Sequence, residues 1–420
     1  MTSQTSGETS SAEATATATA TATLPDRASI SAAADRLNLI VISPLGRSGS
    51  FLIQSLFDGH PEVVCFSEVA QHWHHADSFR AAGQDITTWL DAHPEFHDGR
   101  SFAGEDASMA DALATWFRQR RPLFEDTFRL AWNALDDSAE ERRLYVSLAV
   151  AWACIRGQNL DRLRYMVLQH HNNRAIAGDM PAILRALPDA RILATCRHPI
   201  ESGLSFLTLD RRTGHASFRN YCRNVRGWSV TCWRNMEAVA AQLSDESRLR
   251  LLDLNALHED PDEILRRMTL WLGISDDPAL HGSSICDVPW LGNSADGAPI
   301  PTFEHKRAAL IYPTGIGTEK GLSRSEYRFA EWFTRPFLRS AGYADPATEG
   351  TTSLVGFLWI LFSHMEWFRA DTIAHDRGLK RFARRLGLVE IALVLKELLA
   401  LRRSVRRPLA HLRLDRDPTA

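Results

Sequence analysis

The sequence has no cysteine pattern typical of a disulfide-stapled or zinc-binding protein. Its 420 residues include six cysteines, but these form no CxxC pair and no His/Cys cluster with the spacing of zinc ligands. Cys65 and Cys196 fall in segments that we expect to be strands, which suits buried free thiols. The composition therefore favours a reducing, cytoplasmic location and gives no indication of a metal site.

Long apolar runs are missing as well. The longest, at residues 354–362, contains a glycine and is much shorter than the roughly 20 residues that a membrane-spanning helix needs. The Thr/Ala/Ser-rich start has neither the apolar segment nor the basic cluster of a signal peptide, so we interpret residues 1–35 as a disordered leader. With 45% apolar residues, the chain is long enough to bury a large core.

The stretch at residues 38–68 organises the rest of the chain. Four consecutive apolar residues predict a buried strand at 39–43, and a turn, a helix and a second short strand follow. The first amides of a helix have no intrahelical partner, and the helix dipole points its positive end at the preceding loop, so an anion is a natural ligand there. An arginine before the helix adds a permanent charge. We therefore predict a phosphate loop formed by Arg47, Ser48, Gly49, Ser50 and Phe51.

This phosphate loop contains no lysine. A nucleoside-triphosphatase loop needs a Lys-Ser/Thr pair for the β- and γ-phosphates and for Mg²⁺, so ATP fits poorly and the sequence disfavours a P-loop kinase or nucleotidase. Together with Asp-Gly-His-Pro at 58–61, the loop resembles that of sulfotransferases that use 3′-phosphoadenosine 5′-phosphosulfate (PAPS), especially the tyrosylprotein, carbohydrate and bacterial branches. The resemblance implies PAPS as sulfuryl donor, no metal, and a P-loop-like three-layer α/β/α fold with a central, mostly parallel sheet.

A second unit, at residues 180–209, predicts the other half of the nucleotide site. Residues 191–196 read as a buried strand, and Pro199 opens a new helix. Alternating strands and helices indicate a parallel sheet, and ligands bind at the carboxyl ends of such strands. In the family an arginine ending this strand and a serine eight residues later bind the 3′-phosphate. The resemblance assigns these roles to Arg197 and Ser205.

The resemblance also supplies candidates for catalysis. In the tyrosylprotein branch a glutamate 21 residues after the loop arginine is the general base, and Glu68 stands at that distance from Arg47. Such a carboxylate would take the proton of the acceptor hydroxyl. The same branch has a lysine where this chain has His171, so either His171 or Arg174 replaces it. Lys320, in a glycine-rich basic loop, is a further candidate for the nucleotide site.

Departures from the family pattern leave a second function open. Leu254 and Asn255 occupy positions where family members often carry Tyr-Glu, so a nucleotide contact of that tyrosine is not carried over. Because the family lysine is absent too, a non-catalytic relative that binds nucleotide or glycan is the alternative to an enzyme. His72, His74 and His75 are alternative bases, but without a fixed carboxylate or cysteine nearby they indicate a metal site only weakly.

We expect a leader at 1–35, an α/β domain at 36–345 and a helical tail at 346–420. Within the domain, residues 70–170 show helical periodicity and correspond to the acceptor-binding insertion of the family. The tryptophans of this insertion suit either core packing or stacking on a sugar ring or on an aromatic or lipid-like alcohol; they are Trp73, Trp89, Trp116, Trp132 and Trp152. On the resemblance we expect a carbohydrate or glycolipid acceptor and no nucleic-acid partner.

The tail is strongly basic. Residues 369–420 contain 13 Lys/Arg and 6 Asp/Glu, whereas the whole chain has a net charge of −3. Apolar helices expected at 353–368 and 386–401 alternate with basic clusters, a pattern typical of segments that lie on an anionic membrane surface. The same helices suit a homodimer interface or a cap on the domain. The tail therefore predicts either peripheral contact with the inner membrane face or an assembly role.

Overall fold

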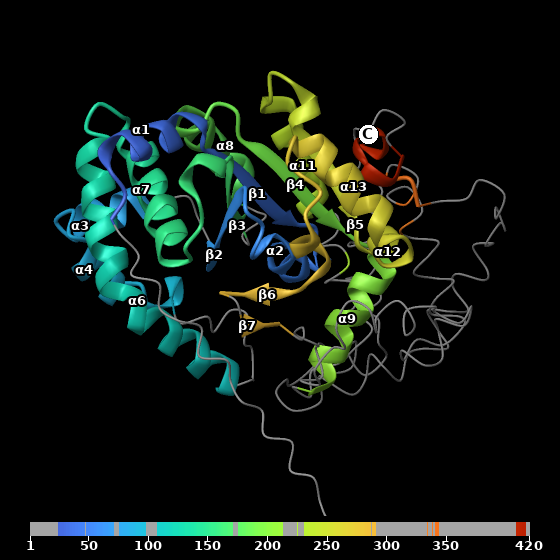
Figure 1. Cartoon of the computed structure of the whole chain (residues 1–420). Helices are drawn as coiled ribbons and strands as arrows, with labels where there is room; N and C mark the ends of the chain where they lie inside the picture. Colours follow the sequence, from blue (N-terminus) through green and yellow to red (C-terminus); the bar gives the residue numbers. More distant parts are fainter. Residues whose placement is uncertain are drawn as a thin grey trace, which may run out of the picture.

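A five-stranded parallel sheet forms the centre of the molecule (Figure 1). The strand order is β2-β3-β1-β4-β5, and every neighbouring pair is parallel. The strands are β1 Asn38–Pro44, β2 Val63–Ala70, β3 Tyr165–His170, β4 Arg191–Cys196 and β5 Leu249–Asp253. The computed structural model describes residues 24–46, 48–70, 75–97, 107–170, 175–212, 225, 231–286, 288–290, 334, 338, 341–343 and 409–416.

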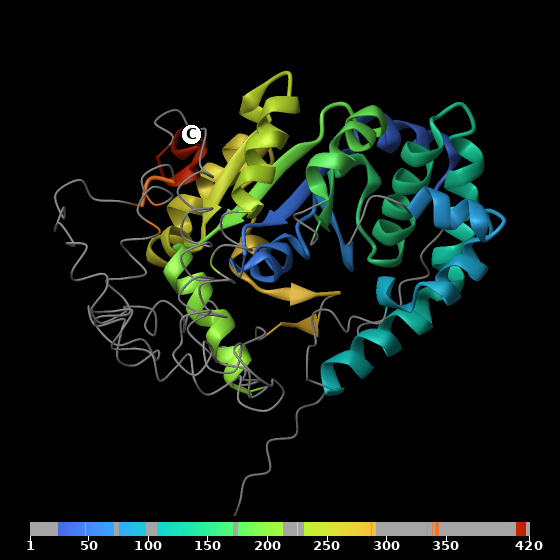
Figure 2. The same cartoon turned by 180° about the vertical axis from the view of Figure 1, so that it is seen from behind.

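Helices gather at both ends of the sheet, and Figure 2 shows the same division from behind. Toward β2 lie α1 Arg27–Arg36, α3 His75–Ala81, α4 Ile86–Ala92, α6 Ala107–Ala134 and α7 Glu140–Ile155. Toward β5 lie α9 Pro199–Arg212, α12 Leu254–Glu259 and α13 Pro261–Leu272. The other described helices are α2 Ser50–Phe57, α8 Ile176–Ala186 and α11 Thr231–Gln242, and a hairpin of β6 Ser284–Ile285 and β7 Val288–Pro289 follows.

Successive side chains of β3 show how the helices divide between the two faces of the sheet. Side chains alternate across a strand. Gln169 donates a hydrogen bond to Ser50 in α2, whereas the next residue, His170, pairs with Asp179 in α8. Helices therefore cover both faces, and the predicted three-layer α/β fold is confirmed.

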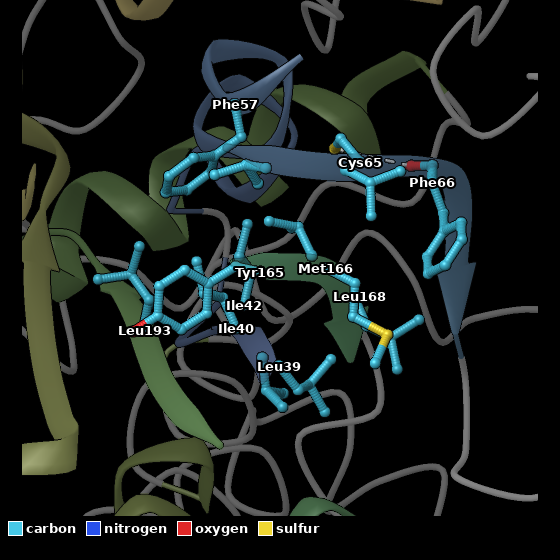
Figure 3. Packing of buried hydrophobic residues seen from close by; sticks show 14 of the residues in the cluster. Leu39, Ile40, Ile42, Phe57, Cys65, Phe66, Tyr165, Met166, Leu168 and Leu193 are labelled. Atoms are coloured by element: carbon cyan, nitrogen blue, oxygen red, sulfur yellow. Dashed lines mark hydrogen bonds between the residues drawn. The ribbon is translucent and has the colours of Figure 1, made fainter. Parts of the chain in front are cut away.

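The core is apolar on both faces of the sheet, because helices cover both. Strands that are buried on both faces are apolar along their whole length, and residues 39–42 of β1 are fully buried. Figure 3 shows part of this core, with Ile40 and Ile42 of β1, Met166 and Leu168 of β3, and Phe57 of α2 among the packed side chains. Burying each such side chain stabilises the fold by about 1.5–3 kcal/mol, so the sheet is a rigid platform for the loops at its carboxyl edge.

The two cysteines expected in strands are buried free thiols, as predicted. Cys65 lies in β2 and Cys196 ends β4. Burial raises the pKa of Cys196 to about 12, so its thiol stays protonated at neutral pH.

Strand β3 lies inside the range 70–170 that the sequence pattern assigned to a helical insertion. The described helices of that range agree with the expectation, but Tyr165–His170 is a strand between β1 and β2. Its sequence, YMVLQH, has only one β-branched residue. Strand preference depends strongly on packing against the neighbouring strands, which here are β1 and β2. Trp89, Trp132 and Trp152 of the same range are buried and serve the core.

The last described residues, 409–416, lie at the β5 edge of the sheet. Arg413 forms a parallel bridge with Leu251, and Arg267 of α13 donates to the carbonyl of Leu414 at 3.0 Å. Figure 1 shows this red segment beside α13. Residues 346–408, which include both predicted tail helices, lie outside the described residues. None of the described helices combines the length and apolar character that a bilayer span requires.

Candidate functional site

Two glycines shape the loop between β1 and α2. Gly46 and Gly49 have φ angles of 83° and 76°, a left-handed conformation that other residues rarely adopt. A Cβ atom on Gly49 would also lie only 2.6 Å from Cδ1 of Leu254. Gly49 is the N-cap of α2, and no side chain caps this eight-residue helix. The loop thus has the backbone geometry that suits an anion.

Side chains from the neighbouring strands converge on this loop. The hydroxyl of Ser48 lies 2.8 Å from that of Thr195 in β4, and Leu45 N–H donates to the Thr195 carbonyl at 2.7 Å. From β3, the Gln169 amide donates to Ser50 Oγ at 2.9 Å. The carboxyl ends of β3, β1 and β4 therefore meet at the loop, where ligands bind in open parallel sheets.

Arg197 follows the end of β4, two residues after Thr195. Its Nε donates to Glu201 Oε2 at 3.0 Å, and the Asn255 side chain donates to the same oxygen at 3.2 Å. Ser205 is half-buried on α9, the helix that Pro199 opens. The structure thus brings the two predicted anion-binding motifs to adjacent strand ends.

Several predicted site residues cannot be placed in the same way. Arg47, His171 and Lys320 lie outside the described residues, as do His72 and His74. Glu68 lies in β2, two residues before its last residue Ala70, and its backbone alone is described. The roles assigned to these residues remain predictions.

A comparison with protein-family models identifies the fold family. The model of the sulfotransferase family matches residues 40–278, which is more than half of the chain and includes both anion-binding motifs. The chain belongs to the sulfotransferase family. No curated protein matches it.

Solved structures similar to this sulfotransferase are distant in sequence. The sulfotransferase domain from the curacin biosynthetic pathway is 16% identical, with a TM-score of 0.38, over 71% of this chain and 97% of that chain. The domain from the Synechococcus PCC 7002 olefin synthase gives the same identity and TM-score over 71% and 94%. Sulfotransferase STF9 from Mycobacterium avium is 12% identical with a TM-score of 0.36, over 73% and 77%.

Three contacts at the candidate site were not indicated by the sequence pattern. Glu201, which holds Arg197, lies four residues later on α9, a spacing that brings opposite charges together. That spacing was a usable signal. Gln169 and Asn255 reach the site from β3 and α12, far away in the sequence. The family pattern marked Asn255 only as a departure, and no local pattern indicated either contact.

His198 separates Arg197 from α9 and is half-buried. Its ring lies against that of Tyr343, with 5.4 Å between centroids, and within the described residues its Nδ1 atom has no hydrogen-bond partner. Burial lowers the pKa of His198 to about 4; Arg197 and Arg413 act in the same direction, while Glu201 opposes them. His198 is therefore neutral at pH 7 and adds no positive charge beside Arg197.

A groove of about 560 Å³ runs along α6. It is lined by Ser108, Asp111, Ala112, Thr115, Trp116, Gln119, Arg120 and Val288. The Arg120 guanidinium lies over the half-buried Trp116 ring, 4.6 Å from its centroid. Among the tryptophans considered as stacking surfaces, Trp116 thus lies at a groove, whereas Trp73 lies outside the described residues.

Proposed function

We propose that this sulfotransferase transfers the sulfuryl group of PAPS to a hydroxyl acceptor, a carbohydrate or a glycolipid. One observation carries the donor assignment: the phosphate loop and Arg197 occupy adjacent strand ends, joined through Ser48 and Thr195. PAPS carries phosphate at both its 5′ and 3′ positions, so it matches two neighbouring anion sites. Family membership supports sulfuryl transfer in general.

In this proposal the protein positions charge and takes a proton. The backbone amides of Gly49 and Ser50, with Arg47, stabilise the 5′-phosphate as it leaves, because donors fixed before the reaction cost no reorganisation. Arg197 and Ser205 hold the 3′-phosphate. Glu68 takes the proton of the attacking hydroxyl, an effect of about 10²–10⁴-fold on rate.

The remaining candidates for the donor site have supporting roles in the proposal. His171 or Arg174 stabilises the transferring group in place of the family lysine, and Lys320 binds the nucleotide. Ser48 and Phe51 belong to the loop and to the first turn of α2. Buried hydroxyls at Ser48 and Ser50 keep the loop polar without adding charge.

Calorimetry with Arg197→Ala tests the donor assignment. We expect adenosine 3′,5′-bisphosphate to bind the wild type more tightly than ATP, and the variant to lose about 1.5–3 kcal/mol, the value of a hydrogen bond to a charged group. Arg191→Ala is the matched control, because Arg191 begins the same strand at its other end and stacks over Trp271. Equal affinity for ATP and the bisphosphate contradicts the proposal.

The acceptor assignment draws on the groove along α6. Arg120 lies over the half-buried Trp116 ring, and hydroxyl, carboxylate and amide side chains line the rest of the groove. This polar lining suits a sugar, whose hydroxyls take hydrogen bonds. Labelled PAPS incubated with glycan, lipid and phenol extracts tests it. Labelling of glycans or glycolipids is expected, and labelling of simple phenols alone refutes it. Nucleotide binding without any labelling supports the non-catalytic alternative.

A further inference from the structure

Glu201 fixes the plane of the Arg197 side chain. The contact uses Nε, the nitrogen nearest the aliphatic stem, and both side chains are largely buried, with 15% and 8% of their surface exposed. Because the guanidinium is planar, a bond at Nε sets the plane in which both terminal nitrogens lie. The orientation of Arg197 therefore depends on where Glu201 is held.

Asn255 in turn holds Glu201 from another part of the chain. Its side-chain amide donates to the oxygen that Arg197 also contacts. Asn255 itself is fixed because its backbone N–H donates to Asp253 Oδ1 at 2.8 Å, which makes Asp253 the N-cap of α12. The end of β5 thus reaches the arginine at the end of β4.

Asp253 is tied to the C-terminal segment 409–416. Arg413 Nη2 donates to Asp253 Oδ2 at 2.5 Å, and both side chains are almost fully buried. The other oxygen of the same carboxylate accepts the hydrogen bond from the Asn255 backbone N–H, so Asp253 joins the C-terminal segment to α12. Arg413 is held in place by Asp415 and by the carbonyl of Ala341.

We propose that Glu201 and Asn255 are positioning residues for the 3′-phosphate arginine Arg197, and that Arg413 of the C-terminal segment supports them through Asp253. This inference rests on the proposed binding of a 3′-phosphate by Arg197. The line of contacts runs from Arg413 to Asp253, through the backbone and side chain of Asn255, and then to Glu201 and Arg197. It gives functions to Asn255, where the family commonly has a different residue, and to residues near the end of the chain.

The test compares two ligands that differ by the 3′-phosphate alone, adenosine 3′,5′-bisphosphate and adenosine 5′-phosphate. For Asn255→Ala and Glu201→Ala we expect the affinity for the bisphosphate to fall about tenfold, the size of one lost hydrogen bond to a charged group, while the affinity for the monophosphate is unchanged. Loss of general stability would weaken both ligands equally. Glu201→Gln keeps an acceptor oxygen, so it should bind the bisphosphate better than Glu201→Ala does.

Coupling to Arg197 gives a second readout. In an Arg197→Ala background, Asn255→Ala should have no further effect on the bisphosphate, because residues that act through one another are not additive. Asn159→Ala is a matched control, since Asn159 also caps a short helical turn, at Leu160–Arg162, where its side chain accepts from the Asp161 N–H at 2.9 Å. It should leave both affinities unchanged.

Arg413→Gln tests whether the C-terminal segment supports Arg197. We expect the same tenfold loss of affinity for the bisphosphate and no change for the monophosphate. If this variant fails to fold, the Asn255 and Glu201 variants decide the role of those two residues, and Asp253→Asn, which keeps an acceptor for Asn255, tests the support from Arg413. A wild type without preference for the bisphosphate refutes the proposed function. A preference that Arg197→Ala abolishes, and that Asn255→Ala and Glu201→Ala retain, overturns this inference alone.

Discussion

Gly49→Ala probes the point where the phosphate loop touches the rest of the site. An alanine there must adopt a positive φ, which costs about 1–2 kcal/mol. Its Cβ would also lie 2.6 Å from Cδ1 and 3.3 Å from Cγ of Leu254. Leu254 is only 6% exposed and has little room to move, so overpacking adds about 1–3 kcal/mol. We expect a total loss of about 2–5 kcal/mol in the free energy of unfolding.

Gly157→Ala separates the two contributions. Gly157 has a φ of 67°, but a Cβ there would meet nothing within 4 Å, so this variant should lose only the conformational part, about 1–2 kcal/mol. In a Leu254→Ala background the cost of Gly49→Ala should fall to the same value, because the contact is gone. Urea unfolding of all variants measures these differences.

The same variants report on the nucleotide site. Relief of the overlap must move either the loop or Leu254, so Gly49→Ala should weaken binding of adenosine 3′,5′-bisphosphate, while Gly157→Ala should not. If Gly49→Ala and Gly157→Ala lose equal stability and bind the nucleotide equally well, the close packing of Leu254 on the loop has no energetic role and the reasoning is wrong.

Three further predictions concern the base, the histidine beside Arg197 and the tail. Glu68→Gln should lower turnover about 10²–10⁴-fold with unchanged bisphosphate affinity, whereas Glu62→Gln, just before β2, should leave turnover unchanged. Retained activity of Glu68→Gln would point to His72, His74 or His171. His198 is protonated in the unfolded chain below pH 6.5 and in the folded chain only below about pH 4, so acidification across that window should destabilise the wild type by up to about 3 kcal/mol more than His198→Gln; parallel pH profiles in chemical unfolding would contradict this. Full-length protein should pellet with anionic vesicles at low salt and not at high salt, and changing Arg402, Arg403, Arg406 and Arg407 to Glu should abolish pelleting; a dimer that stays in the supernatant would show an assembly role instead. Charge reversal tests membrane binding better than truncation after Asp345 does, because truncation also removes the Arg413–Asp253 ion pair.

The sequence alone determined the features that depend on local pattern. The apolar run of β1, the glycine-rich turn and the N-terminus of α2 are contiguous, so their order in the chain predicts their geometry. The same holds for β4 and α9, with Pro199 at the first helical position, and for Gly273, which ends α13 with a φ of 68°. Two anion-binding motifs and an α/β fold follow from these local signals.

Tertiary structure decided which distant segments complete the site. Strand β3 has weak strand character, and pairing with β1 and β2 on both sides makes it a strand. Leu254 and Asn255 are departures from the family pattern in sequence, yet in space one packs on Gly49 and the other holds Glu201. Arg413 lies 160 residues after Asp253. Burial of an ion pair between such distant residues depends on how the whole chain packs, which periodicity and spacing do not encode.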